Sequence, residues 1–141
     1  MLYKYRLAAR DCDWVILKLN RSVLWTMQCA FCKHNAATTA ISTTPLHDLM
    51  TLQSFDAMFA DLPGKPARSS QKLWDWDPTD VQAEVLVFDV IEPSYIKSAM
   101  FYDSMTRARY GHLKMEAPGV SFNVDRVFFE DRSRIRSFVG S

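Results

Sequence analysis

The sequence has 141 residues, of which 48% are hydrophobic and 23% are charged, and its formal net charge is +1. This composition excludes a disordered chain and is enough for one domain with a real core. The small net charge excludes nucleic-acid binding through overall charge, so such binding requires a local patch. No apolar run is long enough for a membrane span or a secretory signal, and the odd count of 3 cysteines favours a reducing cytoplasm.

Alternating and helical patterns divide the first half of the chain. Residues 13–19 alternate and predict a strand, and residues 21–27 predict a short helix. Residues 31–44 are rich in Ala, Thr, Ser and Asn, which is typical of an ordered loop. Thr44 is followed by proline and should cap a helix that continues with helical spacing to Leu62.

The second half contains more strands. Residues 65–79 hold Pro, Ser and basic side chains, which favours a mobile surface segment. Residues 82–90, 96–102 and 120–129 predict strands, and 104–114 predicts a helix. We therefore expect an α+β fold: a single domain with a mixed or antiparallel central sheet and flanking helices.

Glu84 is the polar exception in an apolar strand. Alternation puts it on the same face as Leu86, Phe88 and Val90, and the opposite face is apolar as well. This pattern predicts a central strand that is covered on both sides. A carboxylate there needs a partner or a task. An ion pair with Arg or Lys at the strand end remains the alternative.

Three short motifs occur in a fixed order: Met1-Leu2-Tyr3, Asn35-Ala36-Ala37 and Gln82-Ala83-Glu84-Val85-Leu86-Val87. Together with the strands around them, they resemble the DarT family, toxins that transfer ADP-ribose from NAD to thymidine in single-stranded DNA. They are similar to the family's Pro-Met-Leu-Tyr motif, its Asp-Gly-Asn-Ala segment and its Gln-Ala-Glu-Phe-Leu-Val run, whose Glu is catalytic. The resemblance spans nearly the whole chain.

The resemblance implies roles for several side chains. Glu84 would be catalytic, because a carboxylate stabilises an oxocarbenium-like transition state and can accept a proton. Asn35 would lie beside the thymine, with Met1 and Tyr3 near the acceptor base. Exposed tryptophans stack on nucleobases, so two residues of the 65–79 segment join the expected substrate-binding set. These are Trp74 and Trp76.

Each of these expectations has an alternative. Asn35 can serve only its own backbone turn, and the tryptophans can cover the core. Lys65, Arg68 and Lys72 are candidates for phosphate contacts, or form an ordinary solvated face.

The family resemblance also implies an incomplete site. Family members carry, before Met-Leu-Tyr, a His-containing NAD-binding motif and a catalytic Arg. We therefore expect residues 1–129 to be a DarT-like domain that lacks this NAD-binding part, weakly active or inactive alone, with an exposed basic tail at 130–141. The alternative is a non-catalytic binding protein from a phage or mobile element that inhibits a host defence or nuclease complex. Single-stranded DNA, an antitoxin or host protein, or a second copy are the expected partners.

The cysteines raise the question of a metal. Cys29 and Cys32 form a CxxC that is followed by His34, and Cys12 or His47 would have to complete a four-ligand zinc site. No second CxxC supports this. We expect no metal, and buried cysteine thiols instead.

Overall fold

The computed structural model describes residues 12–130 of the chain. These residues form a small α+β domain with mixed and antiparallel sheets, which confirms the expected fold class. The chain divides into two compact units. Unit 1 consists of two segments, the residues up to Val23 and the residues from Ile91 onwards. Unit 2 consists of Leu24–Val90. Within residues 12–130, no helix is long and apolar enough to cross a membrane.

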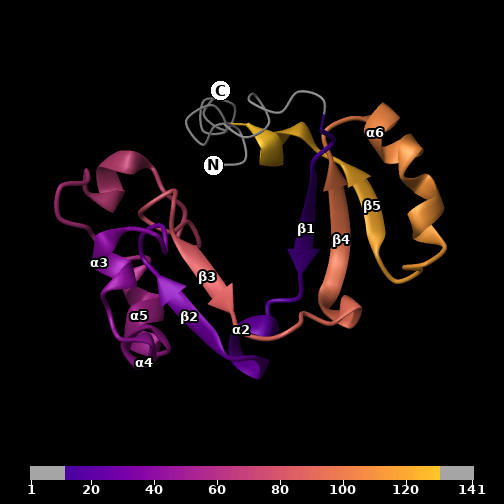
Figure 1. Cartoon of the computed structure of the whole chain (residues 1–141). Coiled ribbons are helices and arrows are strands. Elements are labelled where there is room, and N and C mark those ends of the chain that lie inside the picture. Colours follow the sequence, from indigo (N-terminus) through magenta and orange to yellow (C-terminus); the bar gives the residue numbers. More distant parts are fainter. Residues whose placement is uncertain (1–11, 131–141) are drawn as a thin grey trace. The chain divides into compact units, whose positions relative to one another are not determined.

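Unit 1 is built on a three-stranded sheet of β1 (Val15–Leu19), β4 (Ile96–Phe101) and β5 (Ser121–Val124). The strand order is β1-β4-β5, with β1 antiparallel and β5 parallel to β4. The three strands lie side by side in Figure 1. The strands predicted at 13–19 and 96–102 are therefore confirmed.

A short helical layer follows β4 in unit 1. Helix α6 (Ser104–Arg109) begins after Asp103, whose carboxylate accepts a hydrogen bond from the Thr106 N–H at 2.7 Å. The 3₁₀ turn η3 (Gly111–Lys114) continues the chain towards β5. The buried cluster on the sheet consists of Ala99, Phe101 and Val120, with Ile96, Tyr110, Ala117 and Phe122 packed against it.

The strand predicted at 120–129 is only partly correct. β5 ends at Val124, and η4 (Arg126–Phe129) takes the rest of the segment. The chain changes direction at Asp125, whose side chain accepts a hydrogen bond from the Val127 N–H at 3.0 Å. The ring of Phe129 is completely buried there.

Unit 2 contains a two-stranded antiparallel sheet of β2 (Cys29–Cys32) and β3 (Glu84–Val87). The loop predicted at 31–44 is therefore wrong at its start, because β2 reaches Cys32, and wrong again at α3 (Thr39–Ser42). Cys32 lies opposite Glu84 in the register. The central position predicted for the Glu84 strand is also wrong: among the described residues β3 pairs with β2 alone.

The single helix predicted from 45 to 62 is two helices, α4 (Leu46–Leu49) and α5 (Leu52–Ala57). The break lies at Thr51, which is extended and whose hydroxyl accepts a hydrogen bond from the Ser54 N–H at 3.1 Å. Thr51 is thus an N-cap in the middle of the apolar pattern. The cap expected at Thr44 is wrong, since its hydroxyl donates to the Ala40 carbonyl at 2.8 Å.

The core of unit 2 lies between its sheet and these helices. Phe31 and Phe55 meet edge to face with ring centroids 5.2 Å apart. Three residues form the buried cluster and seven more pack against it: Cys29, Phe31 and Met58, with Leu24, Met27, Phe55, Phe59, Ala83, Val85 and Val87. The remaining short elements are α2 (Val23–Thr26), η1 (Arg68–Gln71) and η2 (Pro93–Tyr95).

Candidate functional site

Glu84 is the first residue of β3 and lies on the face of the strand that is turned away from the core of unit 2. Its neighbours Ala83 and Val85 pack against that core. On the Glu84 face, Leu86 is 37% exposed and Phe88 is 46% exposed. On the same face, the register partners of Leu86 and Glu84 in β2, Ala30 and Cys32, are completely buried. The face is therefore covered over β2 and only partly covered over β3, where the Glu84 carboxylate is half-buried.

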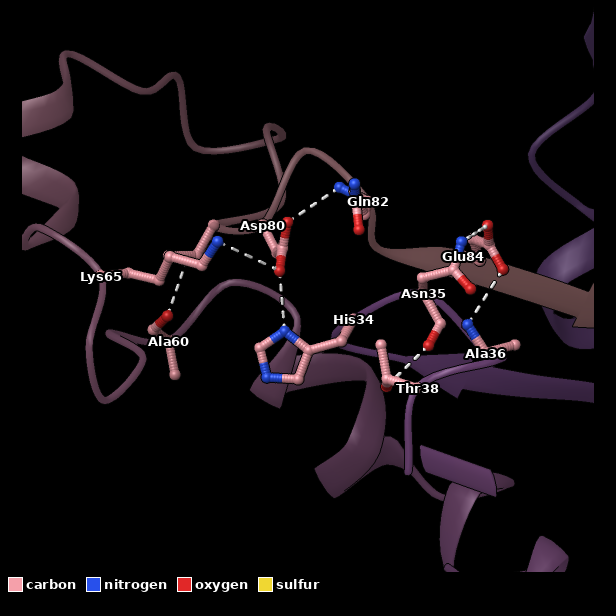
Figure 2. Close-up of polar contacts among 10 residues, drawn as sticks. His34, Asn35, Ala36, Thr38, Ala60, Lys65, Asp80, Gln82 and Glu84 are labelled. Carbon is pink, nitrogen blue, oxygen red and sulfur yellow. Dashed lines mark hydrogen bonds and ion pairs between the residues drawn. The ribbon is translucent and has the colours of Figure 1, made fainter. Parts of the chain in front are cut away.

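Both oxygens of Glu84 are held by the turn that follows β2. Oε1 accepts a hydrogen bond from the Asn35 side-chain amide at 3.1 Å, and Oε2 accepts one from the Ala36 backbone N–H, also at 3.1 Å (Figure 2). Neither donor carries a charge. Within residues 12–130, no Lys or Arg is ion-paired with Glu84. The alternative, an ion pair between Glu84 and an Arg or Lys, is therefore not found among these residues.

Asn35 also organises its own turn. Its Oδ1 accepts from the Ala37 N–H at 2.9 Å, and its carbonyl accepts from the Thr38 N–H at 3.0 Å and from the Thr38 hydroxyl at 2.8 Å. Because the side-chain oxygen fixes the turn, the amide NH₂ is oriented towards Glu84. The turn and the contact to the carboxylate are one arrangement.

A second polar group lies beside this turn. The Nδ1 atom of His34 is 2.7 Å from Oδ2 of Asp80, which also lies 3.6 Å from the Lys65 ammonium (Figure 2). The Oδ1 atom of Asp80 accepts from the Gln82 N–H at 2.9 Å. Burial alone would raise the pKa of Asp80, but these hydrogen bonds and the Lys65 charge outweigh it, so the pKa of Asp80 is lowered.

Comparison with protein families gives a match over residues 1–127, to the family described as ssDNA thymidine ADP-ribosyltransferase, DarT. The chain belongs to the DarT family. No curated protein matches it. The DarT family acts on thymidine of single-stranded DNA and uses NAD as the source of ADP-ribose.

Residues 65–79, which precede the Glu84 strand, contain the candidates for contacts with DNA. Arg68 holds this segment together: its guanidinium donates to the carbonyls of Trp74 at 3.0 Å and Asp77 at 2.7 Å, and to the Thr79 hydroxyl at 3.0 Å. Arg68 is therefore engaged inside the segment. Because Lys65 lies beside Asp80, Lys72 is the remaining member of the phosphate-binding candidates.

Trp74 and Trp76 form an exposed aromatic pair in the same segment. Their ring centroids lie 5.5 Å apart at an angle of 32°. Trp74 is 43% exposed and Trp76 is 72% exposed, so these rings do not serve mainly to cover the core of unit 2.

The two cysteines of the CxxC lie in β2 and are not directed to one common point. Side chains alternate along a strand, so Cys29 and Cys32 point to opposite faces of β2. Burial raises the pKa of both thiols, and the Glu84 charge raises the pKa of Cys32 further. Neither is in a disulfide. No group of three His, Cys, Asp or Glu side chains suited to a metal ion occurs in the described part of the chain.

A cavity of unit 2 lies away from Glu84. It has a volume of about 420 Å³ and lies on the side of β2 that faces the helices. Its lining includes Phe31, Lys33 and Ser54. Glu84 instead lies on the opposite, partly exposed face of β3.

Sequence reasoning named two residues that the structure brings together, Glu84 and Asn35. It missed Ala36 as a donor and the pairing of His34 with Asp80. The sequence shows only an aspartate, Asp80, shortly before the strand glutamate, and its partner His34 is 46 positions away, so no local spacing predicts the pair. Met1 and Tyr3 lie outside the described residues, as does the tail after Glu130.

Proposed function

We propose that this chain contributes the catalytic carboxylate of an ADP-ribosyltransferase that moves ADP-ribose from NAD to thymidine in single-stranded DNA, and that the carboxylate is Glu84. The observation that supports this most is the way Glu84 is held. Two neutral donors orient both oxygens, and no described cation pairs with them. A group that is oriented but not neutralised keeps its negative charge for an incoming substrate.

The reaction asks two things of such a carboxylate. The bond between nicotinamide and the ribose carbon breaks, and nicotinamide leaves with the electron pair. The positive charge that develops on the ribose is stabilised by the Glu84 carboxylate. The ring nitrogen of thymine then forms the new bond to the ribose carbon, and its proton passes to Glu84 as the general base.

Asn35 is proposed to bind the thymine. One N–H of its amide is directed to Glu84, and an amide NH₂ carries a second donor. A thymine carbonyl can accept from this second N–H, which would place the base beside the carboxylate that takes its proton. The same amide would then position acid–base group and acceptor together.

Trp74 and Trp76 are proposed to stack on the bases of the DNA strand. Their exposure and their mutual orientation support this role. Met1 and Tyr3, which lie outside the described residues, complete the proposed acceptor side.

The NAD side of the site is proposed to lie outside unit 2. A dinucleotide needs cations or helix N-termini for its pyrophosphate. The partners of Glu84 in unit 2 are neutral, and Lys65 and Arg68 are engaged with other groups. We therefore propose that unit 2 supplies the acceptor and carboxylate part of a DarT-like enzyme, and that the groups that bind NAD come from outside this unit.

The test is NAD consumption with a single-stranded oligonucleotide that contains thymine. The wild-type chain is compared with Glu84→Gln, which keeps the shape and removes the charge. An oligonucleotide without thymine is the control for base choice. We expect slow, thymine-dependent release of nicotinamide that Glu84→Gln abolishes. Equal rates for the two chains, both above the rate without protein, would remove the catalytic role of Glu84.

A second candidate is a non-catalytic binding protein that kept the scaffold, for instance one that blocks a host protein complex. The observation that favours it is the exposure of apolar side chains just after β3, where Phe88 is 46% and Val90 is 72% exposed. A defined complex on size exclusion that Phe88→Ser disrupts, together with no NAD consumption, would support this function. An inhibitor of this kind would tolerate Glu84→Gln.

A further inference from the structure

We propose that His34 and Asp80 form a positioning pair that holds the turn on Glu84. The pair does not touch Glu84 itself. His34 is the residue directly before Asn35 and Ala36, whose N–H groups bind the two oxygens of Glu84. The role of the pair in catalysis rests on the proposed function, but its role in holding the carboxylate does not.

The first support is the place of the pair in the sheet. Because Cys32 lies opposite Glu84, the chain leaves the ladder at this point on both strands. His34 lies just after β2 and Asp80 shortly before β3, so their 2.7 Å contact connects the two strands beyond the last register pair. In the described part of the chain, the other side-chain hydrogen bonds that connect this turn to β3 are those to Glu84.

The second support is the anchoring of Asp80. Its side chain is 7% exposed. It accepts a hydrogen bond from the Gln82 N–H and forms an ion pair with the Lys65 ammonium. The preceding residue, Thr79, donates from its N–H to the Met58 carbonyl at 2.8 Å. Asp80 is thus held in place within unit 2, and its contact with His34 holds the start of the turn after β2.

The third support is the orientation of the imidazole ring. Asp80 has a lowered pKa and is therefore an acceptor near neutral pH, so Nδ1 of His34 donates the hydrogen bond. In Figure 2 the other ring nitrogen, Nε2, points away from Glu84. Nε2 has no hydrogen bond to the described residues. This geometry is that of a positioning group and not of an acid or base in contact with the reacting atoms.

The direct test measures how firmly the Ala36 N–H is held on Glu84, and it needs no enzyme assay. Hydrogen exchange of the Ala36 amide is followed by NMR in the full chain for the wild type, His34→Leu and His34→Asn. The leucine variant removes the donor, whereas the asparagine amide places an N–H where Nδ1 stood. We expect His34→Leu to exchange the Ala36 amide about tenfold faster, and His34→Asn to restore most of the protection.

The β2–β3 ladder amides serve as the internal control for folding. If they stay protected while the Ala36 amide of His34→Leu exchanges at the wild-type rate, the positioning role is overturned. If His34→Leu does not fold, Asp80→Asn makes the same comparison, because it weakens the acceptor and leaves the imidazole in place. A folded Asp80→Asn chain with unchanged Ala36 exchange also overturns the proposal.

Activity separates this inference from the proposed function. Where the wild type consumes NAD, His34→Leu should lower kcat about tenfold or more with little change in KM, because misplacement of a catalytic group affects the chemical step. If the Ala36 amide of His34→Leu loses protection but the wild type shows no Glu84-dependent NAD consumption, the positioning role of His34 and Asp80 is supported. The proposed transferase activity of the chain is then contradicted. An unchanged kcat in His34→Leu would overturn the catalytic part of the inference.

Discussion

The side-chain amide of Asn35 donates a hydrogen bond of 3.1 Å to Glu84, from 49 positions away in the sequence. The same side chain fixes its own turn through the Ala37 N–H. The carboxylate of β3 is therefore oriented by a turn that follows another strand. The properties of this turn decide how the carboxylate is presented, and they lead to the first prediction.

Replacing Asn35 tests the link between turn and carboxylate. Asn35→Asp keeps the oxygen that accepts from Ala37 but places a second carboxylate against Glu84, which should cost about 1–3 kcal/mol in the free energy of unfolding. Urea denaturation at pH 7 measures this. Asn123→Asp, at an exposed position of β5, is the matched control and should change the value by less than about 0.5 kcal/mol. Equal effects of the two changes would contradict the arrangement.

The lowered pKa of Asp80 predicts a dependence of stability on acid. The folded protein binds the Asp80 proton more weakly than the unfolded chain, so this contribution is fully present above the unfolded pKa, near 4, and is lost as the pH falls through the folded value. Asp80→Asn should cost about 1–3 kcal/mol at pH 7 and progressively less below pH ~4.

Urea unfolding of wild type and Asp80→Asn between pH 7 and pH 3 checks this prediction. The two curves should converge in acid. Asp56→Asn, at an exposed position of α5, is the control and should stay parallel to the wild type. A constant difference between wild type and Asp80→Asn over the whole range would show that the charge of Asp80 does not stabilise unit 2.

Two neighbouring phenylalanines test the packing of unit 1. Phe129 is completely buried and meets the Tyr102 ring edge to face at 5.8 Å, whereas Phe128 is 48% exposed. Phe129→Ala should lower the free energy of unfolding by about 3–5 kcal/mol, because it leaves a cavity. Phe128→Ala should cost less than about 1 kcal/mol. Chemical denaturation of both variants measures this difference, and a reversed order would contradict the position of η4.

The tryptophan pair makes a prediction about DNA. Removing one stacking ring should weaken binding of a thymine oligonucleotide by about 1–3 kcal/mol for Trp76→Ala. Trp25→Ala is the control, since this ring is 65% exposed on α2 and has no proposed contact with DNA. Fluorescence anisotropy at fixed salt measures both affinities. The stacking role is excluded when the two variants bind equally well.

Much of the fold could be predicted where one pattern dominated. The strands β1 and β4 lie in mostly apolar runs of strand length, and α6 follows an aspartate that caps it. The errors have local causes. Cys-Ala-Phe-Cys has no polar alternation, so its periodicity does not predict β2. In residues 45–62, a capping threonine inside an apolar pattern looks like one more helical residue, so the pattern predicts one helix where there are two.

The site could be predicted only in part for a related reason. A carboxylate in an apolar strand is easy to recognise, so the sequence pattern predicts Glu84 as a site residue. Asn35 is predicted by the resemblance to the family motif. His34 and Asp80 follow no spacing rule, because their contact depends on how the ends of β2 and β3 are aligned. Long-range hydrogen bonds of this kind follow from tertiary register, which single-sequence patterns do not contain.

The opposite orientation of Cys29 and Cys32 makes the two sulfur atoms separate reporters. One lies among the core side chains of unit 2, and the other lies on the Glu84 face. Alkylation of Cys29 would follow opening of the interior, whereas alkylation of Cys32 would follow uncovering of the ladder beside the glutamate. Mass spectrometry of the labelled peptide could therefore time the two events independently, with Cys12, which is exposed, as the fast reference.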